Sequence, residues 1–165
     1  MKAIYLFDWG DTLMVDFADE HGKMCHWEKV KAVDGAIETL TQLSHTADIY
    51  IATGAADSTE NDIKTAFKRV GLDPFIKGYF CKANLGFSKG EVEFLPTIMS
   101  KLGAEKFQVT MVGDSLLKDI QPALAAGINA IWLTEQHRKN VPHGASAIQH
   151  LNELCLLHGK LVSKV

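Results

Sequence analysis

The sequence predicts an α/β protein with a doubly wound parallel sheet of about five strands, covered by helices on both faces in three αβα layers. Two observations predict this class. Short apolar runs alternate along the chain with segments whose apolar residues recur at helical spacing. The apolar runs are also nearly continuous, which is typical of strands that are buried on both faces of a parallel sheet.

Five segments have the composition and length of buried strands. They are residues 3–7, 48–52, 76–81, 108–112 and 129–133. Helical spacing of apolar residues predicts helices within the segments 37–43, 63–70, 95–102, 120–124 and 148–155. Gly71, Gly103 and Gly127 follow three of these segments, where a left-handed residue is expected to end a helix.

Length and composition indicate one soluble domain that spans residues 1–165. Seventeen basic and twenty acidic residues give a net charge of −3 without a basic stripe, so we expect no nucleic-acid partner. The longest apolar-rich stretch is too short to cross a bilayer, and the first residues carry no signal-peptide pattern. Three cysteines without metal-ligand spacing are typical of reduced thiols, so we expect a cytoplasmic protein with no membrane partner. The basic segment 137–143 is expected to be a solvated loop.

Polar residues that can carry chemistry follow the predicted strands or lie in the loops beyond them. They are Asp8, the pair Thr53-Gly54, Lys89, Asp114 and Asp119. Because the carboxyl ends of parallel strands meet at one edge of a sheet, these side chains are expected to converge. Any one of them alone is more often a helix cap, a turn hydroxyl or a solvated charge.

Together these residue types suit phosphoryl transfer. A carboxylate such as that of Asp8 can attack phosphorus and form an acyl phosphate. Because a carboxylate repels a phosphate dianion, a Mg²⁺ ion held by Asp8 and Asp114 would be needed to cancel the repulsion. A hydroxyl, backbone amides and a lysine can then hold the phosphate oxygens on which charge spreads in the transition state.

Four motifs, in this order along roughly the whole chain, resemble those of the haloacid dehalogenase-like (HAD) hydrolase superfamily. The loop after the first strand is similar to the motif D-x-D-x-T, and residues 113–119 match G-D-x-x-x-x-D in full. The segment 89–103 resembles the family's K-P-x-P-x-x-F run, with Gly90 and Val92 in place of the prolines. The motif residues are Asp8, Thr12 and Leu13, then Thr53, then Lys89, and finally Gly113, Asp114 and Asp119.

The resemblance implies a Rossmann-like core that acts as a Mg²⁺-dependent phosphoric monoester hydrolase through an aspartyl-phosphate on Asp8. It implies that Asp8, the backbone carbonyl of Gly10 and Asp114 hold the Mg²⁺ ion. It further implies that Thr53, Gly54 and Lys89 bind the phosphate, and that Asp119 lies behind them and orients a metal-bound water or Lys89. The expected partner is a phosphorylated small molecule or macromolecule.

Gly10 departs from the family pattern, because phosphatases of this family normally carry an aspartate there as general acid and base, although glycine also occurs in some of them. A glycine carbonyl can still bind a metal, but the loss of acid–base help costs about 10²–10⁴ in rate. Asp11, His21 or His26 could replace the missing group, or the substrate could have a good leaving group. The alternative function is a catalytically weak or inactive binding protein.

The spacing of the motifs also predicts that the cap domain is absent. The intervals from Asp8 to Thr53 and from Thr53 to Lys89 are too short to hold one, which leaves a flap at about residues 14–27. Within the family, such sites take large substrates or borrow a lid from a second subunit, so a homo-oligomer is possible. A receiver-type phospho-acceptor and a metal-free dehalogenase fit the acidic loops less well.

Overall fold

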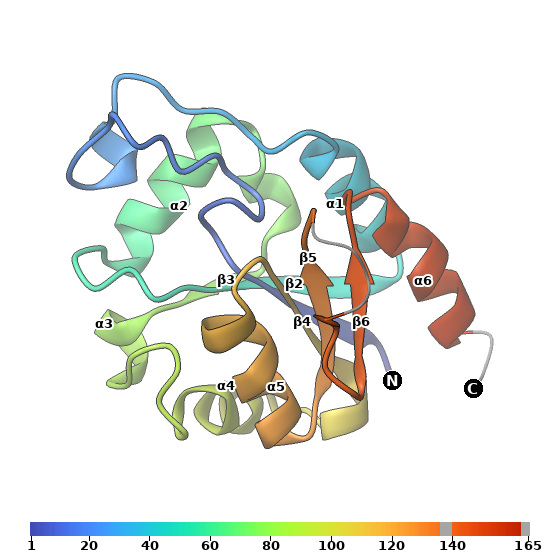
Figure 1. Ribbon diagram of the computed structural model, residues 1–165. Helices are drawn as coiled ribbons and strands as arrows, with labels where there is room; N and C mark the ends of the chain where they lie inside the picture. Colours follow the sequence, from blue (N-terminus) through green and yellow to red (C-terminus); the bar gives the residue numbers. More distant parts are fainter. Residues whose placement is uncertain (136–139, 163–165) are drawn as a thin grey trace.

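The computed structural model describes residues 1–135 and 140–162, with side chains to residue 160. In these ranges six parallel strands form one sheet in the order β3-β2-β1-β4-β5-β6 (Figure 1). The strands are β1 (Ala3–Phe7), β2 (Ala47–Ala52), β3 (Gly78–Phe80), β4 (Val109–Gly113), β5 (Asn129–Leu133) and β6 (Ala145–Ile148).

Between β1 and β4 the sheet has a topological switch point, where successive strands change from one side of β1 to the other. The chain runs outward from β1 through β2 to β3, and then returns to the other side of β1 to continue as β4. In the register, Phe7 of β1 lies opposite Ile51 of β2 and Val112 of β4, so these strands end at one edge. In open α/β sheets, ligands bind at the carboxyl edge where such a reversal occurs.

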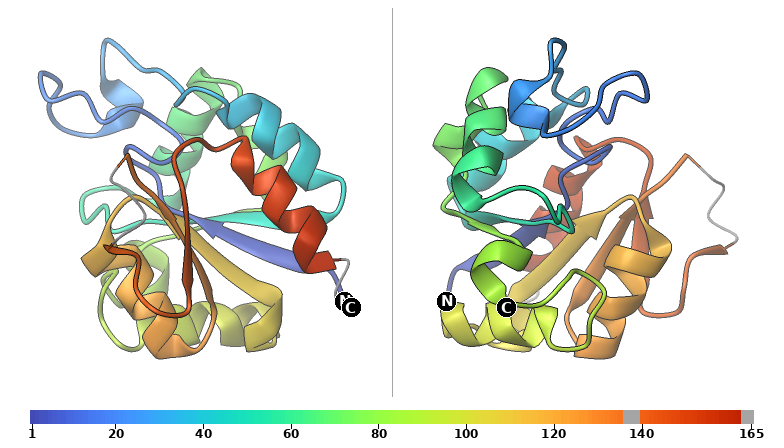
Figure 2. Two further views of the ribbon diagram at one scale, coloured as in Figure 1. Left: turned by 45° about the vertical axis from the view of Figure 1, so that its right-hand side comes forward. Right: turned by 90° about the vertical axis from the view of Figure 1, so that its left-hand side faces the viewer.

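Helices cover both faces of the sheet in three layers (Figures 1 and 2). One face carries α1 (Ala36–Ser44), α2 (Glu60–Arg69) and α6 (Glu153–Val162), and the other carries α4 (Phe94–Leu102) and α5 (Gln121–Ala126). Side chains of β1 point alternately to the two faces of the sheet. Tyr5 and Phe7 belong to the apolar core under α1, α2 and α6, and Ile4 and Leu6 belong to the core under α4 and α5. The Rossmann-like three-layer class is thus confirmed.

Short elements complete the chain that the structure describes. The helix α3 (Lys82–Leu85) follows β3. Three 3₁₀ turns are η1 (Met24–His26), η2 (Asp73–Phe75) and η3 (Lys106–Gln108), and a single π turn, η4 (Leu116–Ile120), leads into α5. Gly103 and Gly127 end α4 and α5 with φ angles of 59° and 76°, a left-handed conformation that favours glycine, as predicted.

The sheet has six strands, one more than the sequence predicts. The missed strand β6 has the sequence ASAI, in which small residues give almost no strand signal. The predicted final helix was therefore wrong at its start, because Ile148 belongs to β6 and α6 begins at Glu153. Ile37 is 46% exposed and so does not share the buried face of Leu40 and Leu43. Of the basic segment, residues 137–139 lie outside the described residues.

The segment between β1 and α1, residues 8–35, forms the loop that carries Asp8 and the flap predicted at about residues 14–27. In Figure 1 the flap crosses above α2. Arg69 of α2 donates to the backbone carbonyls of Trp27 at 2.6 Å and of Met24 at 3.3 Å, and Lys23 pairs with Asp62 of α2 at 2.8 Å. These contacts tie the flap to α2.

Across the described ranges, 1–135 and 140–162, we find no helix with the length and apolar character needed to span a membrane.

Candidate active site

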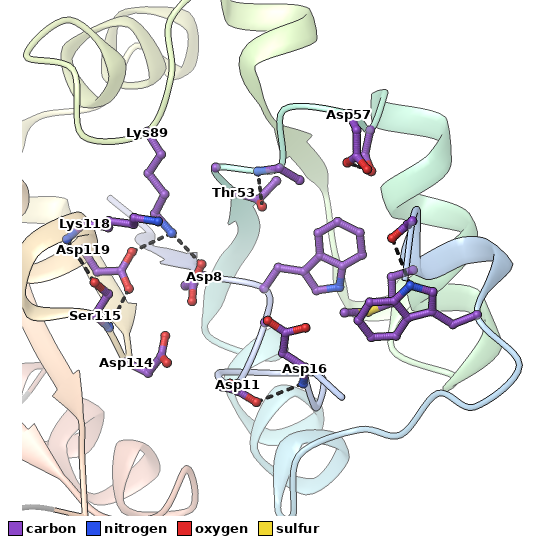
Figure 3. Close-up of a pocket in the computed structure, with 18 residues that line it drawn as sticks. Asp8, Asp11, Asp16, Thr53, Asp57, Lys89, Asp114, Ser115, Lys118 and Asp119 are labelled. Atoms are coloured by element: carbon purple, nitrogen blue, oxygen red, sulfur yellow. Dashed lines mark hydrogen bonds and ion pairs between the residues drawn. The ribbon is translucent and has the colours of Figure 1, made fainter. Parts of the chain in front are cut away.

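A cavity of about 410 Å³ lies at the carboxyl edge of the sheet, beside the point where the strand order reverses (Figure 3). Its walls come from the loops after β1, β2 and β4, from the turn before α4, and from the flap. The structure brings together in this cavity all of the residues that the sequence nominated for the site: Asp8, Gly10, Thr53, Gly54, Lys89, Asp114 and Asp119.

Asp8 is held in place by its backbone and by Thr12. Its backbone N–H donates to the carbonyl of Val112 at 2.9 Å, which continues the pairing of β1 with β4 by one residue. The buried Thr12 hydroxyl donates to Asp8 Oδ2 at 3.0 Å and lies 3.4 Å from Asp114 Oδ1. Thr12 therefore stands between the carboxylates that follow β1 and β4.

Lys89 joins two carboxylates inside the site. Its Nζ atom lies 2.5 Å from Asp8 Oδ1 and 2.5 Å from Asp119 Oδ1, and its side chain is only 4% exposed. Burial alone would lower the pKa of Lys89, but the two carboxylates raise it above its usual range. Burial likewise opposes ionisation of Asp8, yet the nearby ammonium of Lys89 holds the pKa of Asp8 below its usual value. Asp8 is thus a charged carboxylate.

Asp119 forms the second ion pair of Lys89 and is itself held by the backbone. Its Oδ2 atom accepts a hydrogen bond from the backbone N–H of Ser115 at 3.0 Å. Burial raises the pKa of Asp119, and the ion pair with Lys89 opposes this effect. Because both of its oxygens have partners within the protein, Asp119 is suited to fixing the position of the Lys89 ammonium.

Asp114 lies where negative charge is in excess. Burial and the neighbouring Asp8 raise the pKa of Asp114 to about 7. Its backbone carbonyl accepts a hydrogen bond from Trp132 Nε1 at 3.0 Å, which fixes the loop to β5. Asp114 has no ion pair with Lys89 among the described residues, because the Lys89 ammonium pairs with Asp8 and Asp119.

This donor set fits a hard divalent cation. Asp8, Asp114 and Asp119 each place one carboxylate oxygen within 4.8 Å of those of the other two. Carboxylate and carbonyl oxygens are the ligands that Mg²⁺ prefers, and a cation would offset the repulsion that raises the pKa of Asp114. Asp119 is buried, whereas Asp8 is half-buried and Asp114 is exposed, so Asp8 and Asp114 are the carboxylates that an ion in the cavity could reach.

Thr53 and Gly54 form the wall that follows β2. The backbone N–H of Thr53 donates to the carbonyl of Phe80 at 3.0 Å, and its hydroxyl oxygen accepts from the N–H of Ala55 at 3.1 Å. The hydroxyl proton of Thr53 is thereby left to donate into the cavity. A Cβ atom on Gly54 would lie 3.3 Å from Lys89 Cβ, so the glycine allows the lysine stem to pass closely.

Lys89 does not belong to α4, the helix that follows it in the chain. That helix begins only at Phe94. Lys89 lies instead in a turn that is closed by the side chain of Glu91, which accepts from the backbone N–H of Ser88. The turn lets Lys89 reach across to Asp8 and Asp119.

Of the residues that the sequence suggests as replacements for the missing acid, only Asp11 lines the cavity. His21 and His26 are exposed and are not among the residues that line the cavity. Asp11 lines it, but its Oδ1 atom accepts a hydrogen bond from the backbone N–H of Asp16 at 2.9 Å. Asp16 is itself a cavity residue, and no motif in the sequence marks it. Other lining residues that the sequence did not nominate include Met24, Trp27, Asp57, Ser58 and Lys118.

The comparison with known families agrees with this site. A model described as haloacid dehalogenase-like hydrolase matches residues 5–133, and the chain belongs to this family. All of the site residues, from Asp8 to Asp119, fall inside the matched range.

Two relatives match by sequence. YfnB of Bacillus subtilis (strain 168), which is named as a HAD-hydrolase, is 30% identical over 114 residues, or 67% of this chain and 46% of YfnB. PynA of Streptococcus pneumoniae (strain ATCC BAA-255 / R6), named as a pyrimidine 5'-nucleotidase, is 30% identical over 112 residues, or 67% of this chain and 46% of PynA. The chain thus spans about half the length of the curated relatives that it matches.

Solved structures share the fold. A HAD phosphatase from Thermococcus onnurineus is similar with a TM-score of 0.77 and 19% identity, over 96% of this chain and 98% of that one. The magnesium-bound crystal structure of YfnB gives a TM-score of 0.75 and 18% identity, over 94% of this chain and 98% of that one. At these identities the likeness supports the fold.

Proposed function

We propose that this protein is a Mg²⁺-dependent phosphoric monoester hydrolase that works through an aspartyl-phosphate on Asp8. The observation that carries the proposal is the position of Lys89, whose ammonium lies 2.5 Å from both Asp8 and the buried Asp119. This arrangement keeps Asp8 ionised, and therefore nucleophilic, in a pocket where burial would otherwise favour its neutral form.

The chain's own residues account for binding and attack. The Thr53 hydroxyl, the Gly54 backbone and the Lys89 ammonium converge on the cavity beside Asp8 and can hold the phosphate oxygens. The Asp8 carboxylate then attacks phosphorus, and the bond from phosphorus to the ester oxygen breaks. Thr12 keeps the carboxylate oriented through its bond to Oδ2.

A bound Mg²⁺ ion would supply charge neutralisation between the Asp8 carboxylate and the phosphate. Asp8, Asp114 and the Gly10 carbonyl are the groups proposed to hold it. The clustering of carboxylate oxygens and the raised pKa of Asp114 support this assignment. The magnesium that the YfnB structure contains supports it by likeness of family and fold.

The substrate class to test first is a phosphate monoester of a small alcohol or nucleoside. The name of PynA, a pyrimidine 5'-nucleotidase, favours nucleoside monophosphates among these. Met24 and Trp27 of the flap line the cavity and could contact the group that carries the phosphate.

The alternative function is a weakly active or inactive binding protein. Gly10 is the observation that favours it, since the usual acid–base carboxylate of the family is missing at that position. Both proposals predict that the fold and the metal-binding residues are retained, so turnover must decide between them.

A phosphatase screen tests the proposal. Activity on an activated aryl phosphate and on nucleoside monophosphates is measured with Mg²⁺ and with EDTA, for the wild type and for Asp8→Asn. We expect Mg²⁺-dependent turnover that Asp8→Asn abolishes. Asp19→Asn is the matched control, because Asp19 is exposed, lies outside the cavity and pairs only with Lys29 among the described residues. Activity that survives in Asp8→Asn or in EDTA would refute the proposed mechanism.

A further inference from the structure

The inference rests on the proposed function and concerns the proton that the reaction needs. The alkoxide of an alcohol or sugar is a poor leaving group, so its departure from phosphorus requires a general acid. Water that later attacks the aspartyl-phosphate requires a general base. With glycine at position 10, both tasks need a carboxylate from elsewhere in the cavity.

Most carboxylates of the cavity are already engaged. Asp8 and Asp119 pair with Lys89, and Asp114 lies within reach of the Thr12 hydroxyl. In the same cavity, Asp57 accepts a hydrogen bond from Ser58 Oγ at 3.0 Å, and Asp11 accepts one from the backbone N–H of Asp16 at 2.9 Å.

Asp16 is the exception among the cavity carboxylates that the structure describes. Its oxygens have no hydrogen bond or ion pair to another described residue, and its side chain is exposed to the cavity. In Figure 3 the Asp16 carboxylate lies beside the loop that follows Asp8 and points away from the hydrogen bond that the Asp16 backbone N–H makes to Asp11. The Asp16 carboxylate is therefore free to form a hydrogen bond with a bound molecule.

The Asp16 side chain lies next to Gly10. A Cβ atom built on Gly10 would lie 3.5 Å from Asp16 Cβ and 3.6 Å from Asp16 Oδ2. These are ordinary van der Waals distances, so the Asp16 carboxylate lies in the space toward which a side chain at position 10 would project. Glycine leaves this space open, and a residue six positions later in the chain fills it.

The turn between them brings Asp16 back to Gly10. Asp11 takes a left-handed conformation with φ of 57°, which non-glycine residues rarely adopt. Its backbone N–H donates to the carbonyl of Met14 at 2.7 Å, and its side chain accepts from the N–H of Asp16. Asp11 is thus a positioning residue that closes the loop and presents Asp16 to the cavity.

The geometry points to Asp16 as the general acid and base of this active site, in place of a carboxylate at position 10. In the first step Asp8 forms a bond to phosphorus, the bond from phosphorus to the ester oxygen breaks, and protonated Asp16 gives its proton to that oxygen. In the second step water attacks the phosphorus of the aspartyl-phosphate and loses a proton to the Asp16 carboxylate. Phosphate leaves, Asp8 is regenerated as a carboxylate, and Asp16 is again protonated.

The test compares two substrates, one whose leaving group needs a proton and one whose leaving group does not. Release of the alcohol or phenol in a single turnover is measured for an alkyl phosphate and for p-nitrophenyl phosphate, whose leaving group needs no proton. We expect Asp16→Asn to slow release from the alkyl phosphate by about 10²–10⁴-fold and to change release from p-nitrophenyl phosphate by less than about threefold. The substitution keeps the backbone N–H at position 16 that donates to Asp11, and circular dichroism of the variant checks the fold. Asp19→Asn serves as the control.

A second variant moves the carboxylate rather than removing it. Gly10→Asp in an Asp16→Ala background should restore most of the rate that Asp16→Ala loses with alkyl phosphates, because alanine at position 16 vacates the space toward which a Cβ at position 10 projects. Gly10→Asp in the wild type should give no large gain, since that space already holds Asp16.

Two results would overturn the assignment of Asp16. One is an alkyl phosphate rate in Asp16→Asn within about threefold of the wild type, and the other is an equal loss with both leaving groups. Either result, together with Asp8-dependent turnover in the wild type, refutes the role of Asp16 and leaves the proposed function intact. If the wild type shows no turnover that Asp8→Asn abolishes, the proposed function itself fails.

Discussion

The carboxylate of Asp119 occupies the space that a side chain on Gly113 would need. A Cβ atom built on Gly113, the last residue of β4, would overlap the Asp119 carboxyl group. Asp119 is buried, and its oxygens bind Lys89 and the backbone N–H of Ser115. The glycine of the G-D-x-x-x-x-D motif is therefore required because the final aspartate folds back against it.

Replacing Gly113 with alanine should displace Asp119 and with it the Lys89 ammonium. We expect Gly113→Ala to lose at least about tenfold in activity and about 1–3 kcal/mol in the free energy of unfolding, as overpacking of a filled site does. Urea unfolding and turnover of an aryl phosphate measure the two effects. The control is Gly159→Ala in α6, where a Cβ would meet nothing within 4 Å among the described residues, its chain neighbours and its own helix backbone aside, and which should be neutral or stabilising. Unchanged activity in Gly113→Ala would contradict the supporting role of Asp119.

Mg²⁺ should stabilise the protein through Asp114. Because Asp114 and Asp8 repel each other without a cation, binding of Mg²⁺ to the folded state should raise the melting temperature. At a Mg²⁺ concentration of one hundred times Kd, the gain is about 2.7 kcal/mol. Thermal unfolding with Mg²⁺ and with EDTA measures this gain. Asp114→Asn should lose most of the shift and Asp19→Asn should keep it, whereas an equal shift in all three proteins would place the ion elsewhere.

Arg69 should control the flap. Its Nη1 atom donates to the carbonyls of Trp27, Met24 and Cys25, so removal leaves these carbonyls without that donor. We expect Arg69→Ala to raise KM for larger phosphate esters and to speed proteolysis within the flap, residues 14–27, while the rest of the fold persists. Limited proteolysis with mass analysis measures the second effect. Lys68→Ala, at the neighbouring exposed position of α2, is the control. Equal cleavage in both variants would show that Arg69 does not hold the flap.

His158 should make stability depend on pH. Its Nδ1 atom lies 3.0 Å from the Tyr5 hydroxyl and its Nε2 atom 2.9 Å from the Thr46 hydroxyl, and burial lowers the pKa of His158. As pH falls, the unfolded chain therefore takes up the proton first. The stabilisation is complete above the unfolded pKa of about 6.5 and is lost as pH falls toward the folded value.

The matching experiment compares urea unfolding at pH 7.5 and pH 5.5 for the wild type and His158→Gln. Because glutamine does not titrate, the loss of unfolding free energy between the two pH values should be smaller in the variant. The same loss in both proteins would show that His158 does not titrate below its ordinary value.

Much of the fold could be predicted because its central strands are long apolar runs. The segments around β1, β2, β4 and β5 differ from the prediction by one residue or less at each end. The strand β6 could not be predicted, since Ala and Ser carry little strand preference and the strand exists through its pairing with β5. The helical face that includes Ile37 failed because periodicity alone does not say where a packed face ends.

The active site, like the fold, could be predicted only in part from the sequence. By itself the sequence determined which residues lie at the carboxyl edge of the sheet, because motif spacing and strand ends set the positions of Asp8, Thr53 and Asp114 along the chain. Only the tertiary structure decided which side chains meet: that Lys89 joins Asp8 to Asp119, and that Asp16 returns to the open space beside Gly10. The physical reason is that these contacts depend on the conformation of turns and on distances between strands, neither of which a pattern of residue types records.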